Sequence, residues 1–329
     1  MKFGRRLFLL ASIAVIIFSV LGTNNLPQLL DEPEVAKNYF NGLPGANNQI
    51  LVVKIDDTNA AHPQIGVEDA DVVYVEQVEG GLTRLAAIYT SKLPPLIGPI
   101  RSARISDLEL LAQFGRVGFA YSGAQSKMRP VIAAANLENL SAERNPPSIY
   151  GKDPNRAGPV DMILKPDLLL ERANSNPKIR IDSSTVSVFP FGKAPKGETN
   201  TATAKVKWPS AKYELRWDAI AEKWLIYFNE KPNVTASGEQ LFADTAIIQI
   251  VSITPSIYGD KFGEITPFSK TTGTGKAVML RDGFSYQINW QRDAETDLTK
   301  WQTLDGEVAN FKPGRTWIFL TDQAPILTP

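Results

Sequence analysis

The chain has 329 residues, of which 43% are apolar, and its 35 basic side chains balance 35 acidic ones. This length suggests two domains, and the absence of a basic block interleaved with aromatics argues against nucleic-acid binding. The chain has no cysteine, which excludes disulfides, zinc–thiolate sites and thiol catalysis, so the apolar core must stabilise the fold alone.

The N-terminus carries Lys2, Arg5 and Arg6 ahead of an uncharged apolar run, residues 7–21. A basic start followed by an apolar run is typical of a signal peptide. The run is shorter than the about 20 residues of a membrane-spanning helix, so residues 1–22 are predicted to be a signal peptide or an uncleaved membrane anchor. The positive flank directs the remainder outward. We therefore expect an extracytoplasmic protein attached to the cell membrane by an N-terminal helix, or secreted if the leader is cleaved.

The segment 23–45 is rich in Asn, Pro and acidic residues without periodicity, and it is predicted to be a tether. Short apolar runs and longer amphipathic stretches then alternate along the chain, which favours an α/β domain over residues 46–190. The expected strands are 50–55, 71–75, 85–89 and 117–121, and the expected helices are 106–115, 126–137 and 161–172.

Residues 191–204 form a polar stretch that is predicted to be a linker. The rest, 205–329, reads as a smaller, mainly antiparallel β domain, with Asp282-Gly283 as a hairpin turn. All six tryptophans lie in this half, which indicates either core packing or a surface on which carbohydrate stacks. The expected strands are 204–208, 213–217, 224–228, 246–253, 277–281, 284–288 and 315–320.

A charged stretch interrupts the first half. Glu76 and Glu79 precede Gly80-Gly81, a pair that permits a left-handed backbone or a close approach, and Arg84 follows within a few residues. This mixture of residues is unusual for buried strands and indicates either a ligand site or a structural ion-pair network.

A second group, Arg101, Ser102 and Arg104, lies just before a predicted helix start at Ser106, where Ser106 and Glu109 match a capping box. Guanidinium groups beside free helix N–H groups suit a carboxylate or phosphate. We therefore expect the arginines of both groups to converge on an anion.

Catalysis by a pair of carboxylates is the alternative hypothesis to ligand binding. Glu76 and Glu79, with Asp107, could provide the acid and base of a cell-wall glycan hydrolase or lyase. Arg84 would pair with one of these carboxylates and lower its pKa, which opposes a general acid.

The remaining motifs do not indicate a specific chemistry. His62 is the only histidine, and nothing supports a catalytic triad around it, so a surface or anion-contacting role is favoured. The polar turn 56–59 lacks the pattern of a calcium loop. The segment 273–277 lacks the hydroxyl residue of a phosphate loop, so Lys276 is predicted only as a contact from the second domain. No metal and no cofactor are predicted.

Five segments, 63–66, 70–76, 78–84, 98–104 and 272–277, follow one another in register. Together they resemble the YerB-like family of bacterial envelope lipoproteins. The likeness extends from about residue 41 to 320 and implies an α/β domain followed by a smaller β-rich domain, without an established reaction. Relatives usually carry a lipobox that ends in cysteine, whereas Thr23 follows Gly22 here, so residues 7–21 would have to be the anchor.

The sequence therefore predicts an exported, membrane-tethered envelope protein that binds an anionic cell-envelope ligand or a partner protein. The predicted ligand-binding residues are Glu79, Gly80, Gly81, Arg84, Arg101, Ser102, Arg104 and Lys276.

Overall fold

The computed structural model describes residues 36–260 and 263–329, and residues 37–329 form one compact unit. The predicted anchor, 7–21, and most of the predicted tether lie outside the described residues. In the described part, no helix combines the length and the apolarity needed to cross a membrane. The end of the predicted tether belongs to the compact unit, because Phe40 is buried and Asn41 donates to Asp71 at 2.7 Å.

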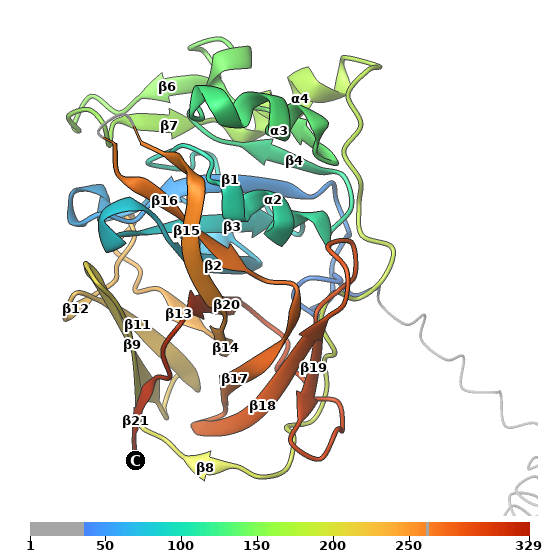
Figure 1. Ribbon diagram of the computed structural model, residues 1–329, viewed down its shortest axis with the longest axis vertical. Coiled ribbons are helices and arrows are strands. Elements are labelled where there is room, and N and C mark those ends of the chain that lie inside the picture. Colours follow the sequence, from blue (N-terminus) through green and yellow to red (C-terminus); the bar gives the residue numbers. More distant parts are fainter. Residues whose placement is uncertain (1–35, 261–262) are drawn as a thin grey trace, which may run out of the picture. The chain divides into compact units, whose positions relative to one another are not determined.

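The centre of the described part is an eleven-stranded mixed sheet to which both halves of the sequence contribute (Figure 1). Its order is β19-β18-β17-β14-β20-β2-β3-β1-β4-β5, with β8 paired to β18. The strands are β1 Leu51–Asp56, β2 Val72–Gln77, β3 Thr83–Tyr89, β4 Val117–Ala120, β5 Leu137–Asn139, β8 Thr199–Asn200, β14 Thr245–Ile250, β17 Gly273–Arg281, β18 Phe284–Arg292, β19 Lys300–Thr303 and β20 Thr316–Thr321.

The halves meet where β20 runs parallel to β2 on one side and to β14 on the other. Most other pairings of the second half are antiparallel, as the sequence predicts for that half. The large sheet therefore contains strands from both sides of the predicted linker, 191–204.

One face of the large sheet packs against a six-stranded sheet with which it shares an apolar core. Strict alternation of buried and exposed positions in Thr203–Trp208 is typical of a sheet with one solvated face. The strands of this smaller sheet are β9 Thr203–Trp208, β10 Ala211–Asp218, β11 Lys223–Phe228, β12 Lys231–Pro232, β13 Phe242–Ala243 and β21 Ile326–Thr328.

The opposite face carries a second core that includes the helix α2, Ile105–Ala112. The hairpin formed by β15 (Ser252–Gly259) and β16 (Ile265–Lys270) contacts both α2 and β2 (Figure 1). The short pair β6 (Tyr150–Lys152) and β7 (Met162–Leu164) completes the described strands.

The α/β prediction for the first half is only partly correct, because strands predominate and the helices are short. The predicted helix 126–137 reduces to a 3-10 turn and α3, Arg129–Ala134, after which Leu137 enters a parallel strand beside β4. The predicted helix 161–172 starts later, as α4, Pro166–Asn174, because residues 162–164 pair as β7 and proline favours the first helical turn.

Candidate functional site

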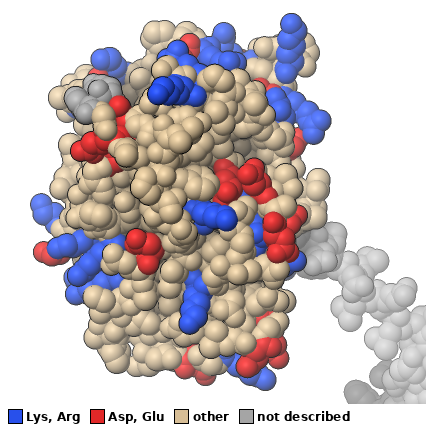
Figure 2. Space-filling model, in the orientation of Figure 1, with Lys and Arg blue, Asp and Glu red and all other residues tan. Residues whose placement is uncertain are grey.

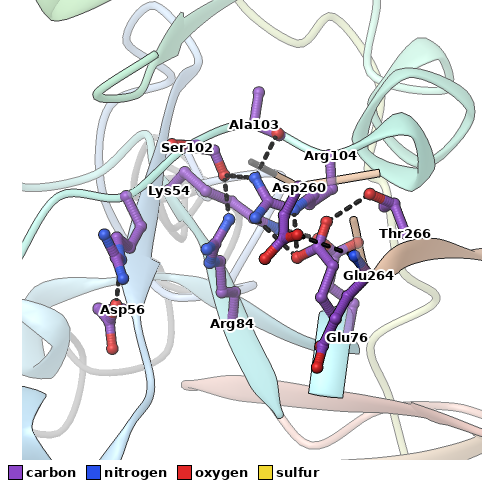
Figure 3. A network of polar contacts seen from close by, with 12 residues as sticks. Lys54, Asp56, Glu76, Arg84, Ser102, Ala103, Arg104, Asp260, Glu264 and Thr266 are labelled. Atoms are coloured by element: carbon purple, nitrogen blue, oxygen red, sulfur yellow. Dashed lines mark hydrogen bonds and ion pairs between the residues drawn. The ribbon is translucent and has the colours of Figure 1, made fainter. Parts of the chain in front are cut away.

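Charged side chains gather at one end of the sheet, on the face that α2 covers. Lys54 and Asp56 of β1 alternate with core residues, and Asp56 lies opposite Arg84 of β3, which in turn lies opposite Glu76 of β2. Residues directly opposite on neighbouring strands share a face, as do residues two apart on one strand. The strands therefore carry four charged groups toward the start of α2 (Figure 3).

The innermost cluster joins Lys54, Glu76 and Asp107, all fully buried. The Lys54 ammonium donates to Glu76 and, at 2.7 Å, to Asp107 Oδ1. Burial and the charge of Asp107 raise the pKa of Glu76 to about 7, against the opposing effect of Lys54. The second Glu76 oxygen, Oε2, is buried without a hydrogen-bond partner. One cation thus faces two carboxylates in a dry environment.

The start of α2 is capped differently from the prediction. The Asp107 carboxylate accepts from the Arg104 backbone N–H at 2.6 Å, whereas the Ser106 hydroxyl accepts from the Ser269 N–H at 3.0 Å. Glu109 accepts from the Thr271 N–H at 2.6 Å. The predicted Ser106–Glu109 capping box is therefore wrong, because Ser106 binds β16 itself and Glu109 binds the residue that follows it.

Two of the three predicted arginines are paired with acids. Arg101 donates to Asp56, and Arg104 contacts Glu79 Oε2 through Nε at 2.8 Å and through Nη2 at 2.7 Å. Burial raises the pKa of Glu79, but the charge and hydrogen bonds of Arg104, with a hydrogen bond from Thr266, hold that pKa below its usual value. These two guanidinium charges are already balanced.

Arg84 differs from the other two arginines. It is buried to 8% exposure, and it donates to the Ser102 carbonyl at 2.8 Å. Among the residues that the structure describes, it forms no ion pair with a carboxylate. Burial, followed by the charges of Arg104 and Arg101, lowers the pKa of Arg84 to about 9. Arg84 is therefore a buried cation without a carboxylate in direct contact among the described residues, although the more distant charges of Glu79 and Asp56 oppose the lowering of its pKa.

A pocket of about 630 Å³ opens beside these arginines. It lies between the charged end of the sheet, the segment after β4 and the β15–β16 hairpin. Five predicted residues therefore share one cavity, with contributions from both halves of the sequence. Its lining is Glu79, Arg84, Arg101, Ser102, Arg104, Gly123, Ala124, Gln125, Ser126, Met128, Glu143, Gly259, Asp260 and Thr266.

Three predicted residues lie outside this lining. Gly80 and Gly81 both have φ of 67°, as the sequence predicts for a tight turn, and a Cβ on Gly81 would lie 2.4 Å from Pro209. The glycine pair therefore seats a turn against the β9–β10 connection. Lys276 is exposed on β17, paired with Asn289 of β18, and it makes no contribution to the pocket.

The carboxylates proposed for a hydrolase are separated by their surroundings. Glu76 and Asp107 are completely buried and held by Lys54, and neither lines the pocket. Glu79 lines it but is bound by Arg104 and Thr266. Because a glycosidase needs two carboxyl groups that reach one bond, this geometry gives the hydrolase reading no support.

Sequence reasoning missed a second polar cluster, around Asp57. The fully buried Asp57 accepts from the Tyr213 hydroxyl at 2.8 Å and lies 3.4 Å from His62 Nε2, while His62 stacks on Phe228 at 4.3 Å. Burial raises the pKa of Asp57 to about 6, against the opposing effect of His62. The cluster ties the loop after β1 to the six-stranded sheet. Within the described residues, no group of three His, Asp or Glu could hold a metal ion.

Comparison with known proteins fits this architecture. Residues 41–180 and 204–318 match the N-terminal and C-terminal domains of the family described as "Protein of unknown function (DUF3048)". The chain is 35% identical over 303 residues to "Putative lipoprotein YerB" of Bacillus subtilis (strain 168), covering 87% of each chain.

The fold is similar to that in the crystal structure of YerB protein from Bacillus subtilis, with a TM-score of 0.74 and 20% identity over 89% of this chain and 100% of that one. At that identity the structural likeness supports the fold alone. The YerB-like resemblance seen in the sequence is confirmed by both matches, and the chain belongs to the DUF3048 family.

Proposed function

We propose that this protein is an extracytoplasmic, membrane-tethered protein that binds a small anionic ligand of the cell envelope in the arginine-lined pocket. The basic start and apolar run of the sequence, together with a relative named as a lipoprotein, support the location.

The observation that carries the proposal is the unpaired Arg84 guanidinium. Leaving a buried charge without a partner is costly, so structural ion-pair networks normally balance their cations. Arg101 and Arg104 follow that rule through Asp56 and Glu79, whereas Arg84, which lines the same pocket, has no such ion pair among the described residues. An anion entering this pocket would supply the missing counter-ion through charge-assisted hydrogen bonds.

The pocket also favours a small ligand, or the end of a chain, over a flat protein surface. Its volume of about 630 Å³ lies within the range of small-molecule sites. On the face in Figure 2, basic and acidic side chains are interspersed, so charge is not gathered there into one large docking area.

The test is stabilisation of residues 37–329 by acetate and by inorganic phosphate at constant ionic strength. A ligand that binds only the folded state raises the melting temperature. We expect at least one of these anions to raise that temperature for the parent and to have no effect on Arg84→Gln. The control is Arg216→Gln, which removes an exposed arginine on β10 and should respond like the parent.

Arg84→Lys separates binding from folding, because it keeps the charge but loses the forked donor. Partial recovery of the response would support anion binding at Arg84. An equal response in the parent and in Arg84→Gln, or no response in either, would contradict the proposal.

A further inference from the structure

A second pocket, of about 460 Å³, lies where the end of α4 meets β5 and the chain that leaves it. Its walls include the buried side chains of Leu140 and Ala173. It shares no lining residue with the arginine-lined pocket of the proposed function. Its volume lies within the range of small-molecule sites, so it is a separate candidate for ligand binding.

Three cationic side chains line this second pocket. Arg144 belongs to a 3-10 turn, Arg172 to the last turn of α4, and Lys178 to the loop that follows α4. All three are exposed, and within the described part of the chain their charged groups form no hydrogen bond and no ion pair. The guanidinium group of every other described arginine has such a partner. The two arginines without a partner therefore share one pocket.

The one carboxylate in the lining is already balanced. Glu138 Oε1 accepts from Arg116 Nε at 2.8 Å and lies 2.7 Å from Arg116 Nη2, and Arg116 is not part of the lining. The other three charges of the pocket are positive and repel one another. Because a hollow lined by charges of one sign concentrates their field, it attracts an ion of the opposite sign. Three cations favour an anion that carries more than one charge.

The end of α4 does not use these cations, although basic side chains often bind the last carbonyls of a helix. The carbonyl of Arg172 accepts from the Ser175 hydroxyl at 2.8 Å. The carbonyl of Ala173 accepts from the Asn176 N–H at 3.1 Å. Arg144 comes from a different element of the fold. The three charged groups thus remain available to a ligand.

We infer that this second pocket binds a phosphate-bearing ligand with two or more negative charges, of the class of a phosphate monoester or a diphosphate. The two guanidinium forks come from different segments, and each matches a pair of phosphate oxygens. Lys178 adds a point charge of the kind that also binds phosphate. A phosphate monoester carries close to two negative charges at neutral pH, whereas a carboxylate carries one. This site is independent of the one around Arg84.

The test is isothermal titration of residues 37–329 with pyrophosphate, inorganic phosphate, dimethyl phosphate and acetate. Ionic strength is held constant, because salt screens exposed charges. All titrations use an Arg84→Gln background, which removes the site of the proposed function. We expect pyrophosphate to bind most tightly, inorganic phosphate more weakly, and the two singly charged probes most weakly.

Arg144→Gln and Arg172→Gln, each added to that background, should weaken pyrophosphate binding about tenfold. Both side chains are exposed and make no contact that the fold requires, so the melting temperature should not change. Arg180→Gln is the matched control. It removes a neighbouring exposed arginine outside the lining and should bind pyrophosphate as the background does.

The same phosphate chemistry occurs in soluble compounds and in lipid headgroups. Co-sedimentation with vesicles of phosphatidic acid in phosphatidylcholine distinguishes these sources. Vesicle binding that is lost in Arg144→Gln assigns the ligand to a headgroup. Pyrophosphate binding without vesicle binding assigns it to a soluble compound.

The inference is overturned if Arg144→Gln and Arg172→Gln bind pyrophosphate as tightly as the background, or if none of the phosphate probes binds. Acetate binding as tight as pyrophosphate binding would also overturn it, because the number of charges would then have no effect. The proposed function is judged separately, by the response of the parent to acetate and its loss in Arg84→Gln. Either proposal can therefore fail while the other stands.

Discussion

Lys54 is a single ammonium group that serves two carboxylates in a dry core. It is fully buried, as are Glu76 and Asp107, which it contacts. Removing one member of a buried ion pair typically costs about 3–5 kcal/mol, because the remaining charges lose their compensation. We expect Lys54→Met to lower the free energy of unfolding by that amount in urea titrations.

The matched control is Lys207→Met, the same change at an exposed position of β9, which should stay within about 0.5 kcal/mol of the parent. Equal effects at the two positions would show that the buried ammonium contributes nothing to the stability of the core.

Glu76 gives the cluster a pH dependence whose sign follows from its pKa, which is raised from 4.5 to about 7. Between pH 4.5 and about pH 7 the folded protein holds the Glu76 proton that the unfolded chain releases. The stabilisation that comes from this proton is therefore complete below pH 4.5 and declines as the pH rises through 7. Glu76→Gln removes this decline. The free energy of unfolding of the variant relative to the parent should therefore increase by roughly 2–3 kcal/mol from about pH 5 to about pH 8.

The comparison with the parent cancels groups that titrate in both proteins, including Asp57, whose pKa is also raised, and Asp56 and Glu79, whose pKa values are lowered. Urea titrations across this pH range provide the measurement. A relative stability that does not change with pH would mean that Glu76 does not hold a proton in the fold.

At the scale of the element, the turn Glu79–Gly81 shows how backbone freedom positions a pocket residue. Gly81 has φ of 67°, and a Cβ there would lie 2.4 Å from Pro209, whereas Gly238 has φ of 87° with nothing within 4 Å. Both Gly→Ala changes incur the left-handed strain of about 1–2 kcal/mol. Only Gly81→Ala also forces the β9–β10 connection away, so it should cost typically 1–3 kcal/mol more in urea unfolding. Equal losses would show that the contact is soft.

The sequence predicts most strands well, because their apolar runs and β-branched residues are local signals. It predicts helices less well, since Leu137 and residues 162–164 pair with strands that are distant in the sequence. The pocket arginines could be found because charge is unusual next to buried strands. Lys54 carried a similar signal within the run 50–55, but its partners depend on strand register, which a single sequence does not reveal.

The same limit applies to the remainder of the site. Gln125 and Thr266 are ordinary polar residues in sequence, and only the tertiary fold brings them to the arginines. Lys276 was expected at the site because it follows a glycine-rich turn, but it lies in the exposed first part of β17, outside the pocket lining.

At the scale of the whole molecule, β20 joins the two halves, because it lies between β14 and β2 and hydrogen-bonds to both. Without β20, β2 would present an open, apolar edge that is prone to aggregation.

All six tryptophans lie between Trp208 and Trp317, so fluorescence reports on the second half, while far-UV circular dichroism reports on both. We expect the two signals of residues 37–329 to give coincident unfolding curves in urea, as one cooperative unit requires. Residues 37–190 expressed alone should show no cooperative transition, whereas a chain that also includes residues 191–329 should show one. Separate transitions in the whole chain, or cooperative unfolding of 37–190 alone, would show that the halves are independent domains despite their common sheet.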